Sequence, residues 1–116
     1  NLARAIKRRN EGKGEFTESL NHNMDQMFAI VDQALQQMNV ILHKPEAVHD
    51  DINVSYNVEN EINNYRNQLK IKNMEDVNNK AYDYQVGVYY MDMVAECEKL
   101  GDYVLNVVQA VIEKKI

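Results

Sequence analysis

Glu98 and Asp102 are the two residues of this chain whose types and spacing could bind a cation or exchange a proton. They lie within a strongly apolar helical pattern, and residues at i and i+4 of a helix stack on one side. At about 100° per residue, both fall on the rim of the apolar arc, beside Met91 and Leu105. Stacked like charges cost a few tenths of a kcal/mol in water and more when half buried. We therefore expect compensation by a cation, by an Arg or Lys of a neighbouring helix, or by a raised pKa.

The other residues with catalytic or ligand potential lack the partners that such chemistry needs. Cys97 lies on the apolar face with no His nearby in the sequence, which predicts a core residue rather than a nucleophile. Glu46 and His49 form a single E-x-x-H motif, whereas di-iron bundles use this motif twice, which argues against a carboxylate-bridged oxidase. His22 and His43 are expected to be solvated. The sequence contains no G-x-S-x-G, Gly-rich phosphate loop or CxxC motif, and we expect a protein that is not an enzyme.

Charge is distributed unevenly along the chain. Five of the 13 basic residues lie within the first 13 positions, and from Gly14 onward eight basic residues stand against 17 acidic ones. An acidic body disfavours binding to a phosphate backbone, so we expect no nucleic-acid partner. The single Cys excludes an internal disulfide and fits a reducing compartment. No apolar run approaches the ~18–20 residues that span a bilayer.

The composition predicts one helical domain, residues 17–116, preceded by a basic arm, residues 1–16. One Pro, four Gly and 45% apolar residues in 116 suit a helical bundle rather than a sandwich or barrel. Residues 2–9 could form a short helix before the break at Gly12 and Gly14. The arm fits either a basic segment beside a membrane or a solvated tail. Because the chain opens at Asn1 rather than Met, we expect it to be part of a longer polypeptide.

Hydrophobic spacing predicts three helices. The first covers residues 17–42, where apolar residues step by four and three: Leu20, Met24, Met27, Val31, Ala34, Met38 and Ile41. Pro45 is placed to open the second helix at its first position, and this helix is expected to end at about Leu69 or Ile71. Asn73 can cap the third helix, although Asn78 and Asn79 make a later start possible, and this helix would run to about Lys114.

These helices predict an antiparallel up-down-up three-helix bundle with a long third helix. The first two would each measure about 39 Å and the third about 55–60 Å. The third helix would therefore outrun its neighbours by an apolar stretch from Val104 to Ile112. Such a stretch needs cover, so we expect a homodimer or another docking partner there.

The third helix contains a stretch that resembles the signature of PhoU-type domains. It reads Glu98-Lys-Leu-Gly-Asp-Tyr-Val-Leu-Asn106, similar to that family's E-R-I-G-D-H-x-x-N motif, with Lys99 for Arg and Tyr103 for His. The second helix carries Glu59-Asn-Glu-Ile-Asn-Asn-Tyr-Arg66, similar to the E-x-E-I-N-x-x-R stretch of PhoU-like domains appended to sodium/phosphate cotransporters. The resemblance covers roughly residues 17–115.

The resemblance implies a cytosolic regulatory module for phosphate uptake, located at the cytoplasmic face of the inner membrane. Its partner would be the membrane-embedded transporter portion of the same polypeptide. The E/D-x-x-x-D motifs of the family bind metal ions in some members, which implies metal ligands at Glu98, Asp102, Glu59 and Asn63. Fe, Zn, Ni and Mg are the candidate ions. Asn63 stands where the family has a second acid, which weakens charge compensation of the ion.

The expected position of the second turn conflicts with a joint site. A turn at residues 72–79 would place the pair Glu59 and Asn63 about 15 Å in height away from the pair Glu98 and Asp102. Either the turn lies later in the chain, or other groups complete each pair. A plain helical assembly module without a metal site is the alternative function.

Overall fold

The computed structural model describes residues 16–45 and 49–115, which form three helices and no strand. The helices are α2 (Glu18–His43), α3 (His49–Asn78) and α4 (Tyr84–Lys115). The predicted all-helical class is therefore confirmed for the described residues. The predicted arm, except for Phe16, and Glu46 of the E-x-x-H motif lie outside them.

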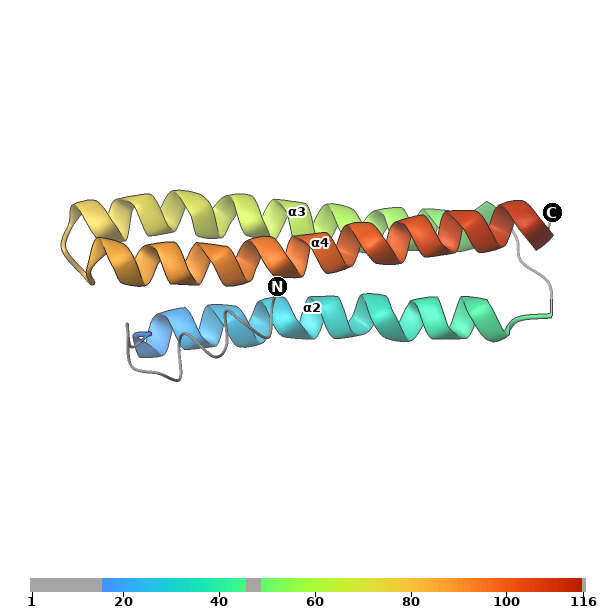
Figure 1. The fold of residues 1–116 in the computed structure, drawn as a ribbon, viewed down its shortest axis with the longest axis horizontal. Helices are drawn as coiled ribbons and strands as arrows, with labels where there is room; N and C mark the ends of the chain where they lie inside the picture. Colours follow the sequence, from blue (N-terminus) through green and yellow to red (C-terminus); the bar gives the residue numbers. More distant parts are fainter. Residues whose placement is uncertain (1–15, 46–48, 116) are drawn as a thin grey trace.

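The three helices lie side by side along one long axis (Figure 1). The molecule measures 52 × 25 × 18 Å, so each helix spans most of its length and the register between helices decides which residues meet. Phe16, two residues before α2, packs edge-on against Tyr90 of α4, with 5.8 Å between ring centroids and an interplanar angle of 86°. The beginnings of α2 and α4 therefore lie at the same end of the bundle.

The sequence predicts the ends of α2 to within one residue. The side chain of Thr17 accepts a hydrogen bond from the backbone nitrogen of Leu20 at 3.1 Å, which satisfies one of the free donors at the helix start. Lys44 ends the helix, and its backbone nitrogen donates to the carbonyl of Ile41. The buried side chains of α2 follow the predicted spacing: Leu20, Met24, Met27, Val31, Ala34 and Ile41.

α3 ends later than the sequence predicts. The end is hard to predict because the residue that terminates the helix is a lysine and not a glycine. Lys80 adopts a left-handed conformation with φ of 59°, a position that usually takes Gly. The backbone nitrogen of Lys80 donates to the carbonyl of Val77 at 3.0 Å, and the backbone nitrogen of Ala81 donates to the backbone carbonyl of Asp76 at 2.8 Å. These two bonds satisfy the last carbonyls of the helix in a Schellman arrangement. The predicted end at Leu69 or Ile71 is therefore wrong.

The later turn also removes the predicted excess length of the last helix. α4 contains 32 residues against 30 in α3 and 26 in α2, so it does not outrun its neighbours in the way predicted. Val104, Val108 and Ile112 of α4 are 4%, 0% and 4% exposed, which means that this chain itself covers them. The stretch from Val104 to Ile112 gives no argument for a dimer.

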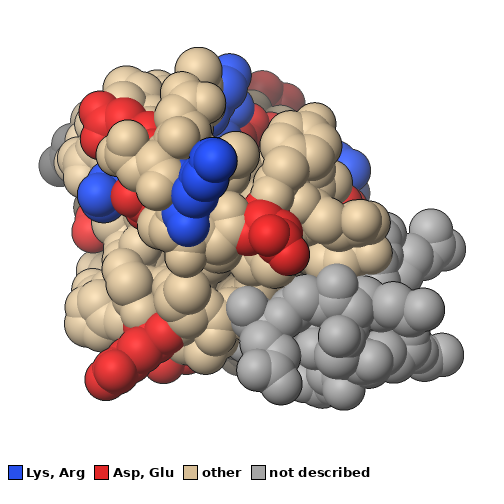
Figure 2. Space-filling model, turned by 90° about the vertical axis from the view of Figure 1, so that its left-hand side faces the viewer, with Lys and Arg blue, Asp and Glu red and all other residues tan. Residues whose placement is uncertain are grey.

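The core runs the length of the bundle and takes side chains from all three helices. Its fully buried members include Met24 and Met27 of α2, Ile62 of α3, and Tyr90 and Cys97 of α4. None of the described helices has an apolar stretch of the length and low charge that crossing a bilayer requires. Figure 2 looks onto the end with the α3–α4 turn, where charged side chains of both signs are separated by broad uncharged areas.

Candidate functional site

Gly101 lets α4 approach α3 closely at the centre of the candidate site. A Cβ atom at Gly101 would lie only 2.8 Å from Cδ1 of Ile62, a buried residue of α3. Cβ atoms essentially never come this close to another atom, so a larger residue at position 101 would force the end of the buried Ile62 side chain to move. The glycine of the signature stretch therefore has a packing role beside the two carboxylates.

The turn between Asn78 and Tyr84 sets a register that places the two predicted pairs at the same height. The number of residues from Asn63 to Asn78, where α3 ends, is nearly the same as the number from Tyr84, where α4 begins, to Glu98. Glu59 and Asp102 likewise lie at nearly equal chain distances from the same two helix ends. Of the two alternatives for the pairs, the structure confirms the later turn: α3 continues to Asn78, so the height difference of about 15 Å does not arise.

Glu59 is the side chain that joins the two pairs. Partial burial raises the pKa of its carboxyl group, and a hydrogen bond and the negative charge of Asp102 raise it further. The charge of Glu98 acts in the same direction, whereas a hydrogen bond with Asn63 lowers the pKa of Glu59. Glu59 thus interacts with each of the other three predicted ligands, and we call Glu59, Asn63, Arg66, Glu98 and Asp102 the carboxylate site.

Arg66 of α3 supplies a positive charge within this site. Its Nε lies 2.8 Å from Oε2 of Glu98, and the two side chains are 34% and 25% exposed. The Nε–H makes no hydrogen bond of good geometry, so the contact is an ion pair by distance rather than a linear hydrogen bond. Lys99 pairs with Glu96 at 3.2 Å. Of the three expected forms of compensation, the structure therefore supplies a neighbouring Arg, which pairs with Glu98. The raised pKa belongs to Glu59, outside the stacked pair.

The carboxylate site suits a hard cation in its donor types but is not assembled around one. Carboxylate and amide oxygens are the ligands that Mg²⁺ and Ca²⁺ prefer. Among the described residues, however, no three His, Cys, Asp or Glu side chains are grouped closely enough to hold a metal ion. Glu98 would have to separate from Arg66 before it could join Glu59 and Asp102 around a cation.

A second glycine marks another close approach of α3 and α4, near their turn. A Cβ atom at Gly87 would lie 2.9 Å from Oδ1 of Asn73, and this oxygen accepts a hydrogen bond from the hydroxyl of Tyr82 at 2.6 Å. Asn73, predicted to cap the third helix, therefore lies inside α3 and ties the turn to it. Gly87 and Gly101 are two heptads apart, so their spacing could have identified the face of α4 that meets α3.

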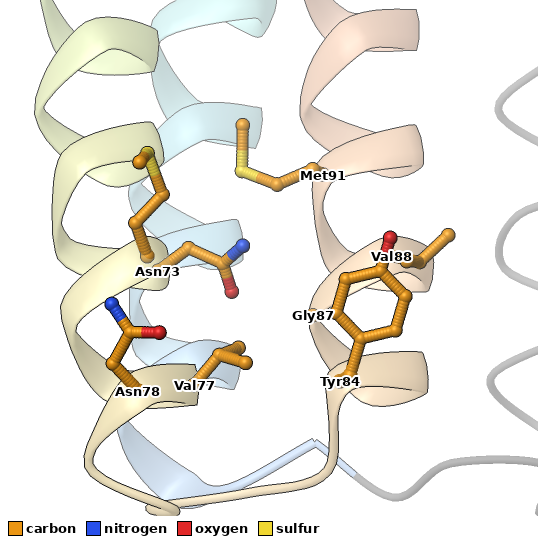
Figure 3. Close-up of a pocket in the computed structure, with 8 residues that line it drawn as sticks. Asn73, Val77, Asn78, Tyr84, Gly87, Val88 and Met91 are labelled. Carbon is orange, nitrogen blue, oxygen red and sulfur yellow. The ribbon is translucent and has the colours of Figure 1, made fainter.

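A cavity of about 340 Å³ opens beside this second contact (Figure 3). Its walls are mostly apolar and come from the end of α3 and the beginning of α4. The lining residues are Asn73, Met74, Val77, Asn78, Tyr84, Gly87, Val88 and Met91. No pattern in the sequence predicts this pocket, because a pocket between helices depends on the register set by the turn.

The remaining candidates have ordinary structural positions. Cys97 is fully buried, and burial raises the pKa of its thiol to about 12, which confirms a core residue rather than a thiolate nucleophile. His22 is exposed, and His43 is exposed with Nδ1 2.7 Å from the carbonyl oxygen of Asn39. Comparison of the chain with family models, with curated proteins and with solved structures gives no match.

Proposed function

We propose that this chain is a PhoU-like regulatory domain, an antiparallel up-down-up bundle that controls a sodium-dependent phosphate transporter. The observation that carries the proposal is the meeting of its two motif stretches. Glu59 of the second helix interacts with Asn63 and with Glu98 and Asp102 of the signature stretch. This meeting supports a common function for the two stretches, because their polar residues then form one site.

In this proposal the carboxylate site is the point at which the bundle responds to a signal. The ion pair of Arg66 and Glu98 links α3 to α4 in the structure described here. A divalent or trivalent cation such as Fe, Zn, Ni or Mg would compete with Arg66 for Glu98. The raised pKa of Glu59 reflects its partial burial and the negative charge around it, and a cation would relieve that charge. The freed guanidinium would then alter the surface that the bundle offers to other helices.

The proposed partner is the membrane-embedded transporter portion of the same polypeptide, met at the cytoplasmic face of the inner membrane. The domain would have no catalytic role and would act by helix docking, as a homodimer or within the transporter. The resemblance supports this assignment through Glu98, Gly101, Asp102 and Asn106, which match the family signature at the same spacing.

A helical assembly module without a metal site is the second candidate function. The observation in its favour is the same ion pair, because Arg66 already compensates the charge of Glu98 at 2.8 Å. In that case the carboxylate site fixes the register of α3 against α4 and has no ligand. Buried or half-buried ion pairs are best known for this kind of specificity.

Calorimetric titration of the full chain with Fe, Zn, Ni and Mg salts separates the two functions. The regulatory proposal predicts binding heats that vanish in the double variant Glu98→Ala and Asp102→Ala. It also predicts tighter binding in Arg66→Ala, because the competing positive charge is gone. Glu61→Ala with Glu75→Ala is the matched control, since both residues are exposed on α3 and removing them changes net charge equally. Heats that are absent in the parent, or unchanged in the site variant, would favour the assembly module.

A further inference from the structure

The side of the bundle where α2 borders α4 differs from the other two sides in the residues that flank the core. On one side of α2, cavities between α2 and α3 are lined by Gln26, Ile30 and Gln37. One flank of α4 meets α3 through Glu98 and through Gln109, whose Nε2 donates to the hydroxyl of Tyr56 at 2.7 Å. The opposite flanks of α2 and α4 therefore border each other, and we call this side the α2–α4 face.

The α2–α4 face combines half-buried apolar residues with acidic ones. On α2, residues 25, 28, 32 and 35 step by three and four, and on α4, residues 89, 92, 96 and 100 do so. The apolar members of these two rows lie against the core but are only partly buried. They are Phe28 and Leu35 of α2 and Tyr89 and Leu100 of α4.

Acidic residues occupy the other positions of the same rows and share one end of the bundle. Asp25 and Asp32 lie about two and four turns after Glu18, and Asp92 and Glu96 lie about two and three turns after Tyr84. Both helices start at the same end of the bundle, so the four carboxylates gather within about 21 Å of that end. α2 contains no Lys or Arg, and α4 contains none before Lys99, which pairs with Glu96 at 3.2 Å.

The segment before Phe16 has the complementary composition. It carries five basic residues and two acidic ones: Arg4, Lys7, Arg8, Arg9 and Lys13 against Glu11 and Glu15. Leu2, Ala5 and Ile6 fall on one side of the predicted short helix at residues 2–9, which would be about 12 Å long. Residues 10–15 reach about 20 Å when extended, so the short helix can return from Phe16 to the level of the four carboxylates.

We propose that residues 1–15, the part of the basic arm before Phe16, fold back and dock on the α2–α4 face. Its apolar residues cover Phe28 and Tyr89, and its Arg and Lys side chains face Asp25, Asp32, Asp92 and Glu96. The arm is thus a fourth element of the bundle, and it lies on a different side from the carboxylate site. This inference does not rest on the proposed function.

Paramagnetic broadening in NMR spectra of the full chain tests the docking. A spin label is attached at Ala5→Cys, while the buried thiol of Cys97 stays unlabelled, as mass spectrometry can verify. The docked arm predicts loss of amide signals at residues 25–32 and 89–96, with signals at residues 57–64 of α3 retained. Broadening spread evenly over the three helices, or confined to α3, would overturn the proposal.

Charge reversal supplies the matched controls. Asp25→Lys with Asp32→Lys is expected to restore the lost signals, and so is Arg4→Glu with Lys7→Glu and Arg8→Glu, whereas the two sets combined re-establish the broadening. Glu61→Lys with Glu75→Lys makes the same change of net charge as the Asp25 and Asp32 reversals, but on α3, and leaves the broadening intact. All substituted residues of α2 and α3 are exposed, and circular dichroism checks that the helices are retained. Broadening unaffected by the reversals on α2 and on the arm would overturn the proposal.

A lipid surface is the competing destination for a basic arm. The labelled chain is therefore also mixed with vesicles of phosphatidylcholine alone and of phosphatidylcholine with phosphatidylserine. Localised broadening in vesicle-free solution supports docking, whether or not anionic vesicles then release the arm. An arm that binds only the anionic vesicles, and gives no localised broadening without them, would overturn the proposal.

Discussion

α2 and α3 both pack on α4, but with different chemistry. The buried side chains of α2 are all apolar, from Leu20 to Ile41. α3 buries Val58, Ile62 and Leu69 and places charged and amide side chains directly beside them, at the carboxylate site. α2 therefore contributes mainly burial energy, whereas α3 contributes a specific register and the residues available for function.

The largest loss of stability is expected from a substitution among the buried apolar side chains of α2. Met27→Ala removes a side chain that is 0% exposed, which should lower the free energy of unfolding by about 2–5 kcal/mol. Urea denaturation followed by circular dichroism measures the loss. Gln33→Ala, at an exposed position of the same helix, is the control. A loss below about 1 kcal/mol for Met27→Ala would mean that α2 is not held by its apolar side.

The next effect tests the close approach of α3 and α4. Gly101→Val should destabilise the bundle by about 1–3 kcal/mol, because the new side chain overlaps Cδ1 of Ile62. Ile62→Val removes that carbon, so the double variant should lose less stability than the sum of the single variants. Ala110→Val, at an exposed position of α4, controls for the helix propensity of valine. Strict additivity of Gly101→Val and Ile62→Val would contradict the contact.

A gain in stability is expected at the turn that sets the register. Lys80 holds φ at 59°, which costs a residue with a Cβ about 1–2 kcal/mol. Lys80→Gly removes this cost but increases the freedom of the unfolded chain, so the net gain should be about 0.5–1 kcal/mol. Thermal unfolding measures it. Asn79→Gly, one residue earlier, has no positive φ to relieve and should not stabilise the protein.

The smallest effect concerns the pH dependence of the carboxylate site. The pKa of Glu59 is raised in the folded chain, so the folded state binds its proton more tightly than the unfolded state does. Its contribution to stability is therefore present at low pH and is lost as pH rises through the window above the ordinary pKa of 4.5. Glu59→Gln should remove this dependence and stabilise the protein at pH 7 by a few tenths of a kcal/mol.

Urea denaturation at several pH values measures that dependence. Glu61→Gln, two residues along α3 and exposed, changes net charge equally and should retain it. A pH profile that is the same for the parent and for Glu59→Gln would show that Glu59 does not sense Asp102.

The sequence predicts the bounds and buried side of α2 far better than the polar contacts between α3 and α4. The three-four spacing of α2 depends only on residues of α2, and its ends follow from Thr17 and Lys44. The end of α3 depends on Lys80 adopting a conformation typical of Gly. Asn78 and Asn79 make a boundary near this position possible, but the sequence does not select it over the one at Asn73. That one turn decides whether Glu59 meets Asp102.

Spacing within one helix identifies Glu98 and Asp102, and the family resemblance implies Glu59 and Asn63, but neither predicts that the two pairs meet. Two features of the sequence carried usable information about it: the glycines two heptads apart on α4, and Arg66 shortly after Asn63 on α3. Neither feature identifies the contact between α3 and α4 until the two helices are placed against each other. Spacing within one helix does not specify the register of the helix that packs on it.

Titration of the Glu59 carboxyl group by carbon-detected NMR is the most direct test of the central claim, that one register joins the two motif stretches. The account predicts a pKa above 4.5 in the parent chain and a value closer to 4.5 in Asp102→Asn, which keeps the size of the side chain but removes its charge. A pKa of Glu59 that lies at 4.5 in both proteins would contradict the account, because α3 and α4 would then not place these carboxylates together.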